Sequence, residues 1–89
     1  MQNTETLKFR KQLAKLPQAD QLAVLDALDA LDTAESFADM PNLKALKGYK
    51  NYFRIRVGNW RIGLFWDGHT CHIDRIGPRG DFYKTYPPK

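Results

Sequence analysis

The chain has few of the residues that build disulfides and metal sites. It contains one cysteine, Cys71, and two histidines, His69 and His72. A lone cysteine cannot form an internal disulfide, which favours a reducing cytoplasm as the compartment. These three side chains also do not complete the spacing of a zinc site, so we expect neither a metal nor another cofactor.

Long apolar runs are also absent. No stretch approaches the roughly 20 residues of a membrane span, and the N-terminus lacks the basic and then apolar pattern of a signal peptide. Hydrophobic residues make up 43% of the chain and charged residues 27%, as in ordinary globular proteins. The 89 residues provide one modest core, so we expect a single domain over residues 1–89 and no membrane contact.

Acidic residues are scarce in the second half of the chain. Residues 1–43 carry four Lys or Arg and seven Asp or Glu, whereas residues 44–89 carry ten Lys or Arg and three Asp or Glu. No glutamate follows Glu35, which excludes a glutamate base from that half. A basic half favours a polyanionic partner such as nucleic acid, although scattered lysines alone would indicate only a solvated surface.

The strongest pattern lies in residues 53–62. Apolar and basic residues alternate there up to Gly58-Asn59, a dipeptide typical of a two-residue hairpin turn. Because a strand sends alternate side chains to opposite faces, we expect Arg56 opposite Arg61, with Arg54 on the same face. Like charges on one face repel each other. A protein that holds three guanidinium groups together is expected to hold them for an anion.

Helical periodicity dominates the first half of the chain. We expect one helix over residues 7–16, closed by Pro17, and a second over residues 18–31. The second helix is expected to bury a stripe formed by Leu22, Leu25, Leu28 and Leu31. Residues 1–6 are expected to fray or to add a short edge strand, and residues 33–48 to serve as a connector.

The second half of the chain follows strand periodicity. We expect strands over residues 50–57, 60–66 and 69–76, and a last short strand over residues 81–86. Pro87-Pro88-Lys89 is expected to end the chain's regular structure. Together the elements predict an α+β fold, in which an N-terminal helical hairpin packs on one face of a small, mainly antiparallel sheet.

The Asp67-Gly68 dipeptide predicts a second two-residue hairpin loop. Such a loop would pair Arg61 with Asp74 and Gly63 with His72. His72 and Asp74 would then join the arginine face, Asp74 would orient Arg61, and Gly63 would leave room for RNA to approach. A β-bulge between these strands would overturn this register.

An arginine-rich sheet face suits the cleavage of an RNA phosphodiester. Attack by the neighbouring 2′-hydroxyl builds negative charge on the phosphorane oxygens, and preorganised cations stabilise that charge more than the ground state. Arginine bonds two phosphate oxygens at once and stays charged. The reaction also needs a base and an acid, for which His72 and Tyr83 are the first candidates and Asp74 and Asp81 the weaker ones. Each of them also has an ordinary interpretation as a surface or packing residue.

Four segments match one known pattern: Phe9 to Pro17, Leu46-Lys47-Gly48, Tyr52 to Arg61, and Ile76 to Tyr83. With them the chain resembles the RelE/ParE superfamily of toxins from bacterial type II toxin–antitoxin systems. The resemblance extends from about residue 7 to residue 86. It implies the fold predicted above and a cognate antitoxin, usually an acidic, partly disordered chain that folds on the toxin.

In the RelE branch, the resemblance implies a ribosome-dependent endoribonuclease that cuts messenger RNA and leaves a 2′,3′-cyclic phosphate and a 5′-hydroxyl. The positions that match its catalytic set are Arg54, Arg56, Arg61, Arg79 and Tyr83. Positions 54 and 56 hold lysine in some members, and arginine there favours phosphate binding over proton transfer. Pro78 stands where many members have a histidine, which makes His72 or Tyr83 more important as the proton-transfer group.

Two alternatives remain open from the sequence. The ParE branch shares the fold but inhibits DNA gyrase, and it generally lacks the full basic set with the tyrosine. A third hypothesis is a catalytically inert member that binds only its antitoxin or RNA. This chain has the full set of Arg54, Arg56, Arg61 and Arg79 together with Tyr83, which favours the ribonuclease.

Overall fold

The computed structural model describes residues 1–87, and these residues form three α-helices, one 3-10 helix and one five-stranded sheet. In chain order the elements are β1 (Asn3–Glu5), α1 (Leu7–Ala14), α2 (Gln18–Thr33), η1 (Phe37–Asp39), β2 (Leu43–Ala45), β3 (Tyr52–Val57), β4 (Trp60–Trp66), β5 (Cys71–Pro78) and α3 (Arg79–Thr85). No helix in this part of the chain is long and apolar enough to cross a membrane.

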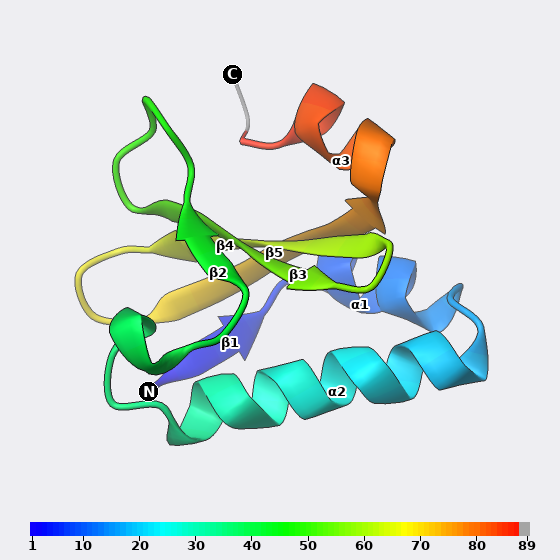
Figure 1. The fold of residues 1–89 in the computed structure, drawn as a ribbon, viewed down its shortest axis with the longest axis horizontal. Helices are drawn as coiled ribbons and strands as arrows, with labels where there is room; N and C mark the ends of the chain where they lie inside the picture. Colours follow the sequence, from blue (N-terminus) through cyan, green and yellow to red (C-terminus); the bar gives the residue numbers. More distant parts are fainter. Residues whose placement is uncertain (88–89) are drawn as a thin grey trace.

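The sheet has the strand order β1-β5-β4-β3-β2. β1 runs parallel to β5, and every other neighbouring pair is antiparallel. In Figure 1, α1 and α2 lie on one side of the sheet and α3 lies on the other. The predicted α+β class is therefore confirmed, and the N-terminal segment takes its predicted alternative of a short edge strand.

The two N-terminal helices cover the sheet with a small number of apolar side chains. The Thr6 hydroxyl caps α1 by accepting a hydrogen bond from the Phe9 amide at 3.1 Å, which satisfies one of the free N–H groups of the first turn. Phe9 is fully buried. The core between these helices and the sheet also includes Val24, Leu31, Ile55, Ile62, Leu64, Cys71 and Ile73.

The predicted buried stripe of α2 is wrong in its first half. Leu28 and Leu31 are buried, but Leu22 and Leu25 are 57% and 44% exposed, and Val24 takes their place in the core. An α-helix turns about 100° per residue, so each step of three residues falls about 60° short of a full turn. A row with constant spacing of three therefore winds around the helix, whereas Val24, Leu28 and Leu31 alternate steps of four and three and stay on one face.

The β3–β4 hairpin has the predicted register. Val57 pairs with Trp60, Arg56 with Arg61, and Ile55 with Ile62. Gly58 supports the turn with a φ of 58°, a conformation that glycine adopts without steric cost.

The predicted β4–β5 register is wrong. The loop contains the four residues 67–70 instead of two, because the Asp67 side chain accepts hydrogen bonds from the His69 and Thr70 amides and builds a wider turn. Trp66 therefore pairs with Cys71. Lengthening the loop by two residues leaves each side chain on its predicted face, so Cys71 stays in the core.

A register shift between Gly63 and Leu64 changes the pairing a second time. Leu64 pairs with Ile73, whereas Gly63 pairs with Arg75, so Asp74 is the extra residue of a β-bulge. Arg61 consequently pairs with Gly77 and not with Asp74.

Two further elements differ from the prediction. The connector over residues 33–48 contains β2, which pairs with β3 as a short edge strand. The segment predicted as a last strand forms α3 instead. Phe82 and Tyr86 lie four residues apart and are both buried, as helical spacing requires, whereas Tyr83 is exposed. Of the predicted Pro87-Pro88-Lys89 end, residues 88 and 89 lie outside the described residues.

Candidate functional site

Three predicted site residues line one shallow pocket on the side of the sheet opposite α2. Its volume is about 520 Å³, and its lining consists of Asn42, Arg56, Gly58, Asn59, Arg61 and Arg79. Arg56 and Arg61 come from paired positions of β3 and β4, and Arg79 opens α3 directly after β5. The hairpin register and the β5–α3 junction therefore bring together guanidinium groups from three elements. We call this the arginine pocket.

Arg61 is the most constrained member of the arginine pocket. Its side chain is 7% exposed, and Nη1 donates hydrogen bonds to the carbonyl oxygens of Gly58 at 2.9 Å and Trp60 at 3.0 Å. These two bonds fix the guanidinium plane against the hairpin turn. A cation held in this way does not have to reorganise when an anion arrives, which is the condition for electrostatic stabilisation of a transition state.

Asn42 is a residue of the arginine pocket that the sequence argument missed. Its carbonyl oxygen accepts a hydrogen bond from Arg54 Nη1 at 2.8 Å, and its Oδ1 accepts one from Arg56 Nη2 at 3.2 Å. Asn42 has a φ of 62°, a conformation that asparagine tolerates better than most residues. The Pro41-Asn42 dipeptide was the available signal, since such pairs mark turns. Asn42 thus orients Arg56 within the pocket and holds Arg54 beside it.

The four arginines predicted for the site have no carboxylate partner among residues 1–87. They are Arg54, Arg56, Arg61 and Arg79. The ion pairs of this part of the chain join Arg10 to Glu5, His72 to Asp67, and Lys84 to Asp81. No buried side-chain nitrogen or oxygen among the described residues lacks a hydrogen-bond partner, so the unbonded guanidinium nitrogens of Arg61 face solvent. The positive charge of the pocket is therefore available to an external anion.

The change from a predicted strand to α3 places Tyr83 about one helical turn after Arg79, outside the lining of the arginine pocket. The Arg79 amide donates to the Asn59 carbonyl at 2.8 Å, which joins the start of α3 to the hairpin turn. Residues four apart lie on the same face of a helix, so Tyr83 follows Arg79 along one side of α3. Tyr83 is 48% exposed and its ring packs edge-on against Phe82, with the centroids 5.1 Å apart.

His72 lies away from the arginine pocket. It stands near the start of β5, five residues before the Gly77 that pairs with Arg61. At about 3.3 Å per residue this separation is about 16 Å. His72 Nε2 lies 2.7 Å from Asp67 Oδ2, and this contact, followed by the amides of Thr70 and His69, lowers the pKa of Asp67 to about 2. The structure therefore does not bring His72 together with the arginines.

The two weaker acid–base candidates, Asp74 and Asp81, also form hydrogen bonds or ion pairs with residues outside the arginine pocket. Asp74 accepts a hydrogen bond from the Tyr86 hydroxyl at 3.0 Å, and burial raises the pKa of Asp74. Burial and the nearby Asp74 charge raise the pKa of Tyr86 as well. Asp81 is exposed and pairs with Lys84 at 3.4 Å. The prediction that Asp74 orients Arg61 is wrong, because the β-bulge directs Asp74 toward Tyr86.

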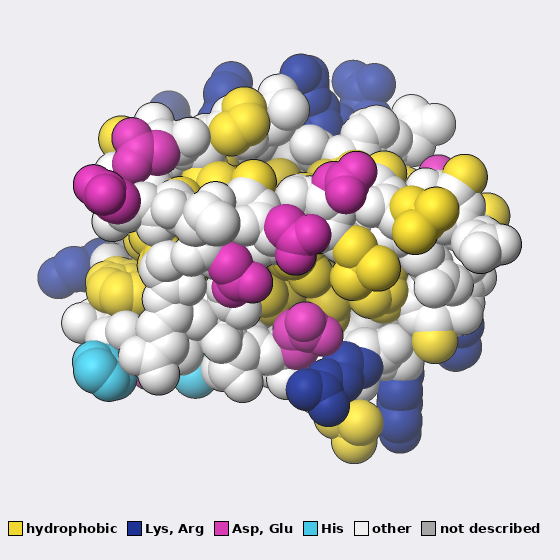
Figure 2. All heavy atoms as spheres, turned by 90° about the horizontal axis from the view of Figure 1, so that it is seen from below, with side chains coloured by type: hydrophobic (Ala, Val, Ile, Leu, Met, Phe, Trp, Pro, Cys, Tyr) yellow, Lys and Arg dark blue, Asp and Glu magenta, His cyan; other side chains and the backbone are white. Residues whose placement is uncertain are grey.

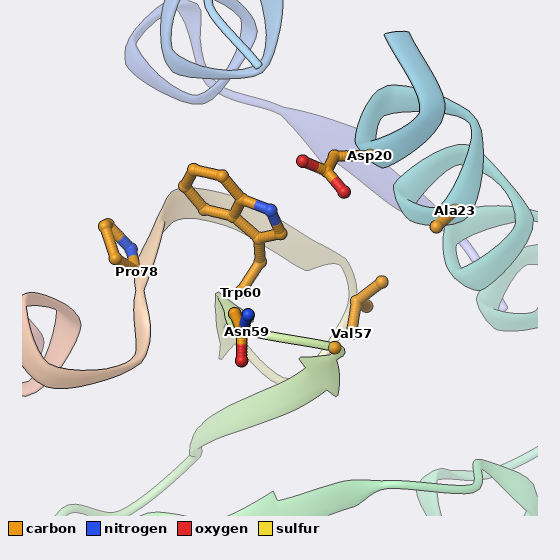
Figure 3. A pocket seen from close by; sticks show the side chains of 7 residues that line it. Asp20, Ala23, Val57, Asn59, Trp60 and Pro78 are labelled. Atoms are coloured by element: carbon orange, nitrogen blue, oxygen red, sulfur yellow. The ribbon is translucent and has the colours of Figure 1, made fainter. Parts of the chain in front are cut away.

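A second pocket lies on the other side of the hairpin, between α2 and the tip of β3 and β4. Its volume is about 240 Å³. Figure 3 shows the Trp60 indole and the Asp20 carboxylate both turned into it. A carboxylate in the lining disfavours a phosphate ligand. Trp60 therefore belongs to the helical side, as its position in the hairpin predicts.

The acidic half of the chain lies over the same helical side. Figure 2 shows acidic side chains gathered along this surface, where α2 contributes Asp20, Asp26, Asp29 and Asp32. Asp26 comes nearest to the arginine pocket, because it lines a neighbouring pocket of about 380 Å³ together with Asn42 and Arg56. No group of three or more His, Cys, Asp or Glu among residues 1–87 is arranged to hold a metal ion.

The fold and the arginine pocket define a small α+β protein in which guanidinium groups from three elements line one pocket. No family model matches the chain. Its structure resembles that of the crystallised RelB–RelE antitoxin–toxin complex from Methanococcus jannaschii, with a TM-score of 0.78 and 30% identity over 93% of this chain and 98% of that one. The chain belongs to the RelE family of toxins, which confirms the resemblance seen in the sequence.

One further relative agrees with this assignment, and two further structures share the fold. The chain is 46% identical over 37 residues to Toxin RelE3 of Methanocaldococcus jannaschii, a match that spans 42% of this chain and 42% of that protein. The archaeal RelE–RelB complex of Pyrococcus horikoshii has a TM-score of 0.71 at 23% identity, covering 89% of this chain and 94% of that one. The RelBE2 toxin–antitoxin complex of Mycobacterium tuberculosis has a TM-score of 0.69 at 24% identity, covering 88% of this chain and 96% of that one. The last two comparisons concern the fold alone.

Proposed function

We propose that this protein is the toxin of a type II toxin–antitoxin pair and cleaves messenger RNA on the ribosome. The observation that carries the proposal is the arginine pocket, where Arg56, Arg61 and Arg79 meet without a carboxylate partner among residues 1–87. The site therefore offers several positive charges to one phosphate. The whole chain, residues 1–89, would act as one toxin domain in the cytoplasm, where its substrate is found.

The arginine pocket supports a transesterification mechanism for the proposed cleavage. The ribose 2′-oxygen attacks the adjacent phosphorus and the bond to the 5′-oxygen breaks, which leaves a 2′,3′-cyclic phosphate and a 5′-hydroxyl. Arg61 and Arg56 stabilise the charge that develops on the phosphorane oxygens, with Arg79 closing the pocket from α3. Arg54 adds charge beside them. The 2′-hydroxyl loses its proton to solvent water as its oxygen bonds to phosphorus, and the leaving 5′-oxygen takes a proton from a side-chain acid.

Tyr83 is the side chain that we assign to proton transfer. It is exposed, lies on the same face of α3 as Arg79, and carries a hydroxyl that can donate a proton to the leaving 5′-oxygen. The arginines themselves stay charged and cannot take this role. His72 is not assigned to it, since it lies about 16 Å along β5 from the position opposite Arg61.

The proposed partner is an antitoxin. RelE is bound to RelB in the crystallised complexes of Methanococcus jannaschii and Pyrococcus horikoshii. The basic half of this chain suits an acidic antitoxin as well as RNA, so the antitoxin would compete with the message for the arginine pocket.

Induced expression in bacteria, with mapping of messenger RNA 5′ ends, tests the proposal. Arg56→Ala and Arg79→Ala are better variants than Arg61→Ala, because Arg61 also holds the hairpin turn through two hydrogen bonds. Lys84→Ala is the matched control, since Lys84 is an exposed cation on the same helix as Arg79. Growth arrest with cuts in the ribosomal A site, lost in both arginine variants and kept in the control, supports the ribonuclease.

Two other results would overturn this function. Growth arrest with DNA damage and intact messages would identify a gyrase inhibitor of the ParE type. Absence of arrest with the wild-type protein, produced without its antitoxin and shown to be folded, would identify an inert binding member of the family.

A further inference from the structure

A row of aromatic side chains crosses the same side of the sheet as the arginine pocket. Tyr52 pairs with Phe65, and Phe65 pairs with His72, so the row runs over β3, β4 and β5. The ring centroids of Tyr52 and Phe65 are 4.8 Å apart, and those of Phe65 and His72 are 6.1 Å apart. Arg56 lies four positions after Tyr52 on β3, and Phe65 lies four positions after Arg61 on β4, so each pair is on one side of the sheet.

The aromatic row, defined as Tyr52, Phe65 and His72, is open to solvent in part. Its three members are half-buried, in contrast to the fully buried Ile62 and Leu64 on the helical side of β4. Tyr49, in the loop after β2, is 42% exposed and stands edge-on to Tyr52 with a centroid distance of 6.4 Å. Buried Tyr86 also packs against Tyr52, with a centroid distance of 5.6 Å, so the row is an aromatic surface that Tyr86 covers in part.

His72 has a fixed position at the end of the row. The hydrogen bond to Asp67 at 2.7 Å holds its ring 6.1 Å from Phe65. Asp67 in turn is tied to the loop backbone by the His69 and Thr70 amides. A ring fixed in this way loses little conformational entropy when a ligand stacks on it.

Basic side chains connect the aromatic row with the arginine pocket. Lys44 on β2 pairs with Arg54 on β3, between Tyr52 and Arg56. Lys47 and Lys50 are exposed in the loop beside Tyr52, and none of these lysines has an ion pair among residues 1–87. The helix that carries the α2 carboxylates lies on the other side of the sheet from α3 (Figure 1). Phosphates of one RNA strand can follow these cations from the pocket to the row.

We propose that the aromatic row binds an unpaired nucleobase of the RNA strand whose phosphate occupies the arginine pocket. The inference rests on the proposed ribonuclease function and adds a base-stacking subsite to it. Arg56 lies four positions after Tyr52 along β3, a distance of about 13 Å. This spans about four nucleotides at the duplex spacing of about 3.4 Å, and fewer in an extended strand. His72 then contributes a stacking ring and takes no part in proton transfer.

Fluorescent messages test the subsite. Ribosomes are programmed with messages that carry a 2′-deoxy sugar at the cleavage site, which prevents attack, and 2-aminopurine at successive positions on either side. Stacking on an aromatic ring changes 2-aminopurine fluorescence. We expect a change on toxin binding at one position about two to four nucleotides from the uncut link. The change should disappear with Phe65→Leu, which keeps an apolar side chain, and persist with Phe65→Tyr, which keeps the ring.

An abasic message provides the second measurement. The wild-type protein should bind ribosomes about tenfold less tightly when the base at that position is missing, because each base stacked on an aromatic side chain contributes measurably to affinity. Phe65→Leu should bind both messages equally. Leu22→Ala, at an exposed apolar position on the helical side, should behave as the wild type.

The outcomes separate the inference from the function on which it rests. If unmodified message is cut and Arg79→Ala abolishes cutting, but no reporter responds and the abasic message binds as well as the intact one, the subsite is overturned and the ribonuclease stands. If the wild-type protein leaves the unmodified message intact, the proposed function is overturned and the subsite with it. Thermal melting of Phe65→Leu and Phe65→Tyr shows that both variants remain folded.

Discussion

The ring of Tyr86 lies directly over Gly63 of β4. A Cβ atom at position 63 would be 2.6 Å from Tyr86 Cε2, closer than any ordinary contact. Tyr86 is 1% exposed, and its hydroxyl donates to Asp74 at 3.0 Å. Gly63 is therefore required for contact with α3, and the open space predicted above it is occupied by Tyr86. This contact fixes the helix that carries Arg79 and Tyr83.

Gly63→Ala is expected to destabilise the fold by about 1–3 kcal/mol, because the added methyl group meets the Tyr86 ring in a packed site. Chemical denaturation measures the free energy of unfolding. The matched experiment adds Tyr86→Leu, which removes the ring. The double variant should lose less stability than the sum of the two single losses, because the collision is no longer present. Additive losses would show that the two residues do not meet.

Tyr83→Phe is expected to lower the cleavage rate by about 10²–10⁴-fold if the hydroxyl transfers a proton. The ring and its contact with Phe82 remain, so the melting temperature should not change. Single-turnover cleavage on programmed ribosomes measures the rate. Tyr49→Phe is the control, since Tyr49 is exposed to a similar extent, 42% against 48% for Tyr83. A rate close to that of the wild type would exclude Tyr83 from proton transfer.

Arg56→Ala is expected to weaken RNA binding and also to make it less dependent on salt. Each phosphate contact contributes about 0.7 to the slope of the logarithm of the binding constant against the logarithm of salt concentration for single strands. Removing Arg56 should reduce the slope by about that amount. Titration of a non-cleavable RNA at several salt concentrations measures it. Lys11→Ala, on an exposed position of α1, should leave the slope unchanged.

The Asp67–His72 contact is expected to contribute to acid stability. The pKa of Asp67 falls from 3.8 to about 2 on folding, first because of the His72 hydrogen bond and then because of the Thr70 and His69 amides. Since the folded pKa is the lower one, the contribution is complete above pH 3.8 and is lost as the pH falls through about 2.

Melting temperatures measured against pH test this expectation. Asp67→Asn should melt at a lower temperature than the wild type at neutral pH, and the difference should shrink in the acid range. Glu35→Gln, at an exposed site, serves as the control. A constant difference between Asp67→Asn and the wild type at every pH would contradict the assignment.

Cys71 is expected to react slowly in the folded protein. Burial, together with the charges of Asp74 and Asp67, raises the pKa of its thiol to about 12, and the thiolate is the reactive form. Alkylation followed by mass spectrometry should be slow in buffer and fast in denaturant. Fast labelling of the folded protein would contradict the burial of Cys71.

The sequence by itself determined the arginine pocket's two central members. Alternation along residues 53–62 and the Gly58-Asn59 turn were sufficient to place Arg56 opposite Arg61, because a two-residue hairpin has one register and a strand has a period of two residues. The same local rules gave the helical first half and the α+β class. Each of these features depends on neighbours in the chain.

Only the tertiary structure decided where the remaining site residues lie. The Asp67 side chain widened its loop, and a bulge at Asp74 moved Arg61 opposite Gly77. Phe82 and Tyr86 made the last segment a helix, because both could then be buried against β4 and β5. The bulge and the choice between helix and strand in a short segment depend on contacts between residues far apart in sequence, whereas the wider loop depends on local side-chain hydrogen bonds. Hydrophobic periodicity contains no information about either kind of contact.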